Sequence, residues 1–109
     1  MKRNNEQVHN KHTQEIKQYP HILGLENIIM STGEVLLFKP DGNIFRAPDN
    51  VLIDYNNRIL YNVEYKCHGC RSKANVQLKQ SGEMLRLMFD QFEVVNLYVH
   101  DNYKLEVIE

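Results

Sequence analysis

Two acidic residues and a lysine in the middle of the chain are spaced so that they could bind a metal ion and act on a phosphate. Asp49 precedes one β-forming run, and Glu64 and Lys66 end the next one. Side chains two residues apart in a strand point to the same face, so Glu64 and Lys66 share a face. If Asn56-Asn57 forms a two-residue turn between the runs, Asp49 lies directly opposite Glu64, with Cβ atoms about 5 Å apart.

The same register decides which other carboxylate belongs to this group. Asp54 also precedes Glu64 on the neighbouring run, but the register pairs it with Ile59, near the turn and on the other face of the hairpin. Asp54 is therefore expected to lie outside the site. A three-residue turn would shift the register and reverse this assignment.

Two carboxylates held side by side repel each other unless a positive charge lies between them. A hard divalent cation such as Mg²⁺ or Mn²⁺ prefers oxygen ligands and keeps several of its waters, so it suits this pair. Lys66 would then stand where an ammonium group can orient a water or stabilise charge on a phosphate. The alternative is an exposed polar hairpin face, on which Glu64 and Lys66 form a weak surface pair and Asp49 caps a turn.

A known family has a similar pattern. The chain has Pro48-Asp49, then fourteen intervening residues, then Glu64-Tyr65-Lys66, with strand patterns around both and a helix pattern after them. This arrangement resembles the PD-(D/E)XK nuclease superfamily, which includes restriction endonucleases, Holliday junction resolvases and phage or repair nucleases. The resemblance covers roughly residues 33 to 109. It implies a restriction-endonuclease-like α/β fold with a central mixed sheet flanked by helices, with Asp49 and Glu64 as metal ligands and Lys66 as the catalytic lysine.

Further residues enter through the same resemblance. Many members of the superfamily supply another acidic ligand from an N-terminal helix, which corresponds here to Glu15 or, as an alternative, to Glu26. Many also carry a polar residue on the helix after the motif, where this chain has Gln77; its alternative is a solvated helix position. Basic residues after the motif would contact DNA phosphates, or else form an ordinary solvated helix face. They are Arg71, Lys73 and Lys79.

The elements that must hold these residues follow from the hydrophobic pattern. Hairpins are expected over residues 33–45, 48–66 and 93–109, the last one turning at Asp101-Asn102. Helical spacing of apolar residues predicts a helix over residues 72 to 92, with Ser72 as its N-cap and with Gly82 weakening or bending it. The order strand, helix, strand predicts one crossover connection and a mixed sheet with helices packed against it.

Length and composition bound the class of protein. With 109 residues, 42% of them hydrophobic, the chain is expected to form one domain over residues 1–109. Its polar residues 1–13 form either a flexible arm or the start of a helix that ends before Pro20. Because so small a domain buries a modest core, a homodimer is expected. No signal peptide and no membrane-spanning stretch are seen, which predicts a cytoplasmic protein with no membrane partner.

The net charge of −1 excludes a uniformly basic coat, so contacts with nucleic acid must come from local patches. Cys67-His68-Gly69-Cys70 suggests a different activity, because a C-x-x-C can be half of a zinc site or a redox pair. Two cysteines are too few for a disulfide framework and fit a reducing compartment. The sequence favours a Mg²⁺- or Mn²⁺-dependent endonuclease acting on DNA. A catalytically inactive nuclease-fold binding module and a small Cys/His zinc or redox protein are the alternatives.

Overall fold

The computed structural model describes the chain from residue 2 to residue 109, with side chains described from residue 9 onward. None of the described helices is long and apolar enough to cross a membrane. In chain order the elements are α1 Lys2–Gln18, the 3-10 helix η1 Pro20–Leu23, β1 Ile28–Ser31, β2 Leu37–Phe38, β3 Ile44–Arg46, β4 Asn50–Asp54, β5 Ile59–Tyr65, α2 Arg71–Met88, β6 Glu93–His100 and β7 Lys104–Ile108.

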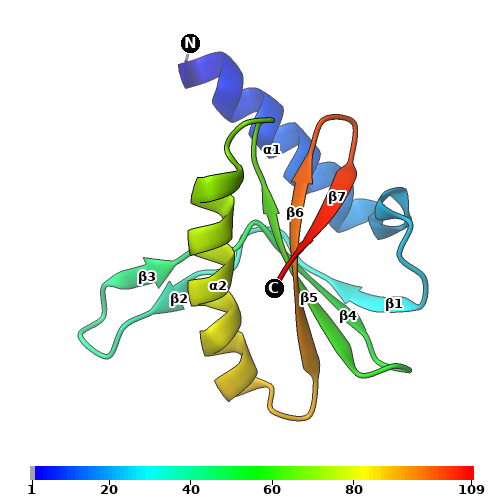
Figure 1. The fold of residues 1–109 in the computed structure, drawn as a ribbon, viewed down its shortest axis with the longest axis vertical. Coiled ribbons are helices and arrows are strands. Elements are labelled where there is room, and N and C mark those ends of the chain that lie inside the picture. The colour runs from blue at the N-terminus through cyan, green and yellow to red at the C-terminus, as the bar shows by residue number, and fades with distance from the viewer. Residues whose placement is uncertain (1) are drawn as a thin grey trace.

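Five of the strands form one mixed sheet in the order β1-β4-β5-β6-β7. Neighbours are antiparallel except for β5 and β6, which run parallel and are connected through α2. The strands β2 and β3 form a separate hairpin that projects to one side of the molecule (Figure 1). The predicted α/β class, the mixed sheet and the crossover through a helix are confirmed.

The two long helices cover opposite faces of the sheet, with α2 in front of it and α1 behind it in Figure 1. Ile16 of α1 is fully buried and packs in one core cluster with Val63 of β5. Leu85 of α2 packs in another cluster with Leu60 of β5. Because alternate side chains of a strand face opposite sides, the even-numbered residues of β5 face α2. Glu64 therefore lies on the α2 side of the sheet.

The β4–β5 hairpin has the predicted register, with a ladder that runs from Asn50↔Val63 to Asp54↔Ile59. Its turn differs from the prediction, because it contains residues 55–58 rather than two residues alone. The positive φ of 56° falls on Arg58, and neither asparagine adopts one. The register survives because the longer turn is still centred on the two asparagines.

Asp54 stabilises this turn. Its Oδ1 accepts a hydrogen bond from the Asn57 backbone amide at 3.1 Å, and its Oδ2 accepts one from Asn57 Nδ2 at 2.7 Å. The carboxylate is buried at the turn end of the hairpin, opposite to the end that carries Glu64. Asp54 thus lies outside the candidate site, as the register predicted.

Several element boundaries differ from the prediction. The helix α2 begins at Arg71 and ends at Met88, and its N-cap is Cys70 rather than Ser72. The strand β1 was not predicted, because it is short and only partly buried. The helix α1 covers most of the segment for which an arm was the alternative. The β6–β7 turn contains residues 101–103 rather than two residues.

Gly82 allows α2 to approach β6 closely, and the helix continues through it. A Cβ at this position would lie 2.5 Å from Oδ1 of Asn96, so a larger residue would displace the buried Asn96 side chain. The same region holds a buried polar group, in which Asn62 Nδ2 donates to Ser81 Oγ at 2.9 Å and to Asn96 Oδ1 at 3.0 Å. This close packing fixes the position of α2 relative to the end of β5.

Candidate functional site

The end of β5 brings Glu64 and Lys66 together. Glu64 is the second-last residue of the strand and is only 8% exposed, and Lys66 follows the last residue. The Lys66 amide donates to the Val99 carbonyl at 3.1 Å, which extends the parallel pairing of β5 with β6. The Lys66 Nζ lies 3.7 Å from Glu64 Oε1. The two side chains therefore point the same way.

Asp49 lies in the bend just before β4 and is buried. Its amide donates to the Val63 carbonyl at 3.1 Å, and its Oδ2 accepts a hydrogen bond from the Tyr65 amide at 2.7 Å. The direct Asp49–Glu64 pairing that the register implied is thus replaced by backbone bonds to the residues on either side of Glu64. The carboxylate is fixed by its own backbone and by the neighbouring strand, so its position does not depend on a flexible loop.

His9 of α1 also reaches this group. Its Nε2 lies 3.0 Å from Oδ2 of Asp49, and its side chain is 36% exposed. The hydrogen bond to Asp49 raises the pKa of His9 above 6.5, against the opposing effect of burial. The helix on the far face of the sheet therefore contributes a nitrogen donor at the end where Glu64 and Lys66 lie.

Glu64 is held in an environment that disfavours its charge. Burial and the negative charge of Asp49 raise the pKa of Glu64 from 4.5 to about 8, although Lys66 and His9 act in the opposite direction. Like charges in a buried place are costly unless a cation compensates them. The nearby ammonium and imidazole groups do not compensate these two carboxylates completely.

These residues line a cavity of about 410 Å³ whose wall is somewhat more polar than apolar. Asp49, Glu64 and Lys66 form one side, while Gln77 and Ser81 of α2 line it from another. The projecting β2–β3 hairpin and the segments next to it complete the wall with Glu34, Ile44, Phe45, Arg46, Ala47 and Pro48. The structure thus brings Asp49, Glu64, Lys66 and Gln77, all chosen from the sequence, to one cavity.

Comparisons of this chain with protein-family models, with curated proteins and with solved structures find no match. The carboxylate oxygens here are of the ligand type that a hard divalent cation prefers. Asp49 and Glu64 offer buried carboxylate oxygens, and the charge of one raises the pKa of the other. A cation between them would remove that repulsion.

Three residues with ionisable side chains at this cavity were not predicted from the sequence, namely His9, Glu34 and Arg46. His9 precedes the motif by forty positions in a polar segment, and no local pattern connects the two. Arg46 could have been chosen from the sequence as a site residue, because it stands three residues before Asp49. Its Nε donates to Gln80 Oε1 at 2.7 Å, so α2 holds the guanidinium at the cavity.

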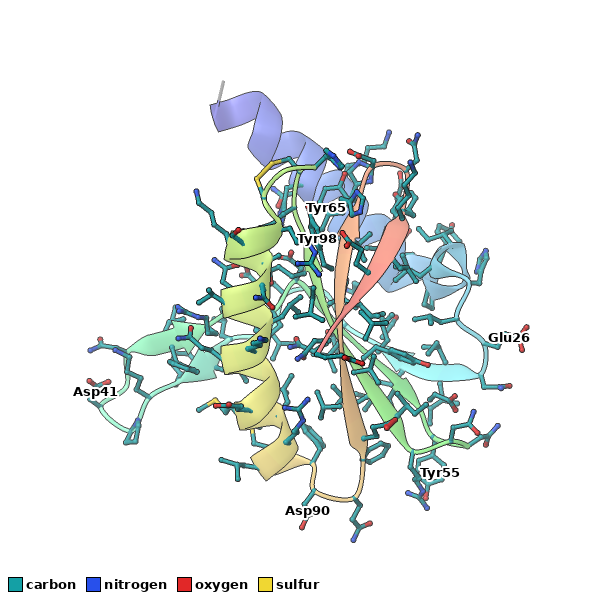
Figure 2. All side chains as sticks on the ribbon, viewed as in Figure 1. Glu26, Asp41, Tyr55, Tyr65, Asp90 and Tyr98 are labelled. Carbon is teal, nitrogen blue, oxygen red and sulfur yellow. A yellow bond between two sulfur atoms is a disulfide. The ribbon has the colours of Figure 1, made fainter. Side chains whose placement is uncertain are left out.

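The acidic residues expected as the third ligand lie elsewhere. Glu15 accepts a hydrogen bond from the Tyr103 hydroxyl and lies 4.0 Å from Lys11 Nζ, and it does not line the cavity. Glu26 is exposed at the outer edge of the molecule, after η1 (Figure 2). Neither is therefore placed to complete the site. Among the residues whose side chains are described, Glu34 is the other acidic residue that lines it.

The three basic residues of α2 have different positions. Arg71 is paired with Glu106 of β7 through Nε and Oε1 at 3.1 Å. Lys73 is exposed one helical turn before Gln77, on the face of α2 that lines the cavity. Lys79 follows Gln77 by two positions, about 200° around the helix, and so points away from it. Lys73 is thus the member of this group that lies nearest the cavity face.

The two cysteines are joined to each other in a disulfide across the loop between β5 and α2. The bond appears in yellow above the amino end of α2 in Figure 2. This state differs from the reduced pair that the sequence suggested. It closes a short loop directly after Lys66, and it engages both sulfur atoms that a Cys/His zinc site would use.

Proposed function

We propose that this chain is a Mg²⁺- or Mn²⁺-dependent endonuclease that hydrolyses DNA phosphodiester bonds. The observation that carries the proposal is the meeting of Asp49, Glu64 and Lys66 in one polar cavity, with the pKa of Glu64 raised to about 8 by burial and by Asp49. Perturbed carboxylates in a cleft are typical of functional sites. The strand, turn, strand and helix that surround the motif in PD-(D/E)XK nucleases correspond here to β4, its turn, β5 and α2, which supports a restriction-endonuclease-like fold.

Asp49 and Glu64 would hold the metal ion, with His9 beside Asp49 as a further donor. The ion would supply Lewis-acid polarisation of a phosphoryl oxygen. Lys66 places an ammonium group 3.7 Å from Glu64 Oε1, where it can donate to a phosphate oxygen or to a water in the cavity. Gln77 lines the same cavity from α2 and can orient that water through its amide.

Binding of the DNA backbone would depend on a few local basic side chains, since the net charge of the chain is −1. Arg46 lines the cavity, and Lys73 extends from the same side of α2. Both can contact phosphates without reading sequence. A small domain of this kind suits recognition of DNA shape, as at a nick or a four-way junction. Two copies in a homodimer would allow cleavage of both strands.

The decisive experiment is cleavage of linear, nicked and four-way-junction DNA with Mg²⁺ or Mn²⁺. Asp49→Asn, Glu64→Gln and Lys66→Met are each expected to reduce the rate by at least about 100-fold. Matched controls are Asp90→Asn and Lys104→Met, which make the same changes at positions outside the cavity. Metal-dependent cutting that persists in the three site variants would refute the proposal, and so would the absence of cutting of any of these DNAs.

A second candidate function is a nuclease-fold module that binds DNA or a protein without turnover. The contact between His9 and Asp49 favours it, because a protonated imidazole could compensate the carboxylate in place of a metal ion. The two functions differ in metal affinity. A Mn²⁺ titration followed by thermal melting should show stabilisation if the site is a metal centre. Unchanged melting together with retained DNA binding would favour the module.

A further inference from the structure

A second group of metal-ligating side chains lies at the ends of β5 and β6. His68 is in the loop after β5, His100 is the last residue of β6, and Asp101 begins the turn to β7. One ligand atom from each of these residues lies within 4.8 Å of the other two. This group contains two imidazoles and one carboxylate, whereas the pair in the cavity consists of carboxylates.

The distances within this group match those around a tetrahedral ion. Asp101 Oδ2 lies 3.2 Å from Nδ1 of His68 and 3.4 Å from Nδ1 of His100. Ligands about 2.0–2.1 Å from a tetrahedral Zn²⁺ are separated from each other by about 3.3 Å. A Zn²⁺ ion could therefore be bound with small side-chain adjustments.

The surroundings of His100 resemble the outer shell of a zinc site. Its second ring nitrogen, Nε2, lies 3.3 Å from Oε2 of Glu106, while Nδ1 faces Asp101. The other oxygen of Glu106 is paired with Nε of Arg71 at 3.1 Å. Metal-bound histidines commonly donate their other N–H to a carboxylate, which fixes the tautomer and ring orientation. His100 is 10% exposed at its side chain and is thus already held in place.

The loop that carries His68 is restrained close to His100. The Cys67–Cys70 disulfide closes the loop around His68, and the Tyr98 hydroxyl donates to the Cys67 carbonyl at 2.6 Å. The two imidazole rings lie 5.4 Å apart between centroids. His68 itself is exposed, so one side of the group faces water. A bound ion would have three protein ligands and an open position.

We propose that His68, His100 and Asp101 bind Zn²⁺, with Glu106 supporting His100 as an outer carboxylate. Borderline ions that accept imidazole nitrogen suit this donor set, whereas Mg²⁺ prefers oxygen alone. The site is separate from the Asp49–Glu64 pair and does not depend on the proposed nuclease function. Its thiol-free ligand set also distinguishes it from a zinc site built on the cysteines.

Titration with Zn²⁺ by calorimetry tests the site in the oxidised protein. The Asp49→Asn variant serves as the background, because it weakens the other candidate centre. One Zn²⁺ per chain is expected, and His68→Ala or Asp101→Asn should weaken its binding by at least about 10-fold. Asn suits position 101, where φ is 29°, so the second variant should fold. His21→Ala, a change at an exposed histidine of η1, should have no effect.

Two further variants distinguish this site from one built on sulfur ligands. Glu106→Gln should weaken Zn²⁺ binding by about 10- to 100-fold, as loss of an outer carboxylate does. The Cys67→Ser, Cys70→Ser double variant should retain binding, and bound Co²⁺ should show no thiolate-to-metal charge-transfer absorption. Failure to bind Zn²⁺ would mean that Asp101 merely pairs with the two histidines and would overturn the proposal. Loss of binding in the double cysteine variant, together with thiolate-to-metal absorption of Co²⁺ bound to the native protein, would overturn it in favour of sulfur ligands.

Discussion

Replacing Glu64 with glutamine is expected to stabilise the metal-free protein at alkaline pH, although the change removes a carboxylate of the proposed metal centre. The folded chain raises the pKa of Glu64 from 4.5 to about 8, through burial first and the charge of Asp49 second. The folded protein therefore keeps a proton on Glu64 that the unfolded chain has already released. Glutamine keeps the shape of the protonated acid and cannot ionise, so the variant avoids the free-energy cost of a buried negative charge.

The direction and size of the effect follow from this difference. Stability that depends on protonated Glu64 is fully present below pH 4.5 and is lost as the pH rises towards about 8. The full loss corresponds to at most about 5 kcal/mol, and rearrangement around the charge will reduce it to a few kcal/mol. This is a large share of the roughly 5–15 kcal/mol that stabilises a small domain. His9 acts in the same direction, because its raised pKa gives stability that is lost above pH 6.5.

Urea denaturation with chelator at pH 6 and pH 9 would measure the effect. The native protein should lose at least about 1 kcal/mol more than Glu64→Gln over this interval, equivalent to a difference of about 4 °C in Tm. Glu83→Gln, the same change at an exposed position of α2, is the control. His9 is retained in Glu64→Gln, so the difference reports on the Glu64 charge and on its smaller effect on the pKa of His9. Equal pH dependence in both proteins would refute the conclusion that burial and Asp49 penalise this charge.

Other predictions concern packing and ligand binding. Gly82→Ala should destabilise the protein by about 1–3 kcal/mol in spite of alanine's higher helix propensity, since the new Cβ would lie 2.5 Å from Asn96 Oδ1. Gly33→Ala, whose Cβ would have its nearest contact at 3.6 Å, should be nearly neutral in the same denaturation assay. Arg46→Gln should weaken DNA binding and lower the salt-dependence slope by about 1 in a fluorescence titration, whereas Arg58→Gln at the β4–β5 turn should leave the slope unchanged.

The register of the β4–β5 hairpin could be predicted because it is a local property. Two β-forming runs of similar length leave few ways to pair, and a polar turn centred on Asn56-Asn57 selects one of them. The crossover connection through α2 could be predicted in the same way. A segment whose apolar residues have helical spacing lies between two strand-forming runs. The turn contains four residues rather than the predicted two, but its centre is the same. Every predicted residue pair between the two strands is therefore preserved. The local sequence pattern was therefore sufficient to predict that Asp49 and Glu64 lie at the same end of the hairpin.

The contribution of α1 could not be predicted, because it depends on tertiary packing. The segment has little apolar surface, and Ile16 is its fully buried side chain among the residues whose burial is described. Further tertiary contacts, such as the hydrogen bond that Asn50 Nδ2 donates to the Thr13 carbonyl at 2.9 Å, also position α1 and with it His9. The sequence around His9 carries no sign of these contacts. Glu15 lies on the same helix as His9, but its carboxylate accepts a hydrogen bond from Tyr103 of the β6–β7 turn and does not line the cavity. The short strand β1 was missed for a similar reason, because it is held by pairing with β4.

Both candidate centres lie at the carboxyl ends of β5 and β6, the parallel pair of the sheet, where the chain diverges into loops that can hold ligands. The loop of residues 67–70 leads from Lys66 to α2 and carries His68. Zn²⁺ bound by His68 should therefore slow amide hydrogen exchange in this loop and in the turn of residues 101–103. Mn²⁺ bound between Asp49 and Glu64 should instead slow exchange around the start of β4. If Zn²⁺ protected the start of β4 and left the loop unchanged, the two ions would share one site, and the assignment of separate centres would be wrong.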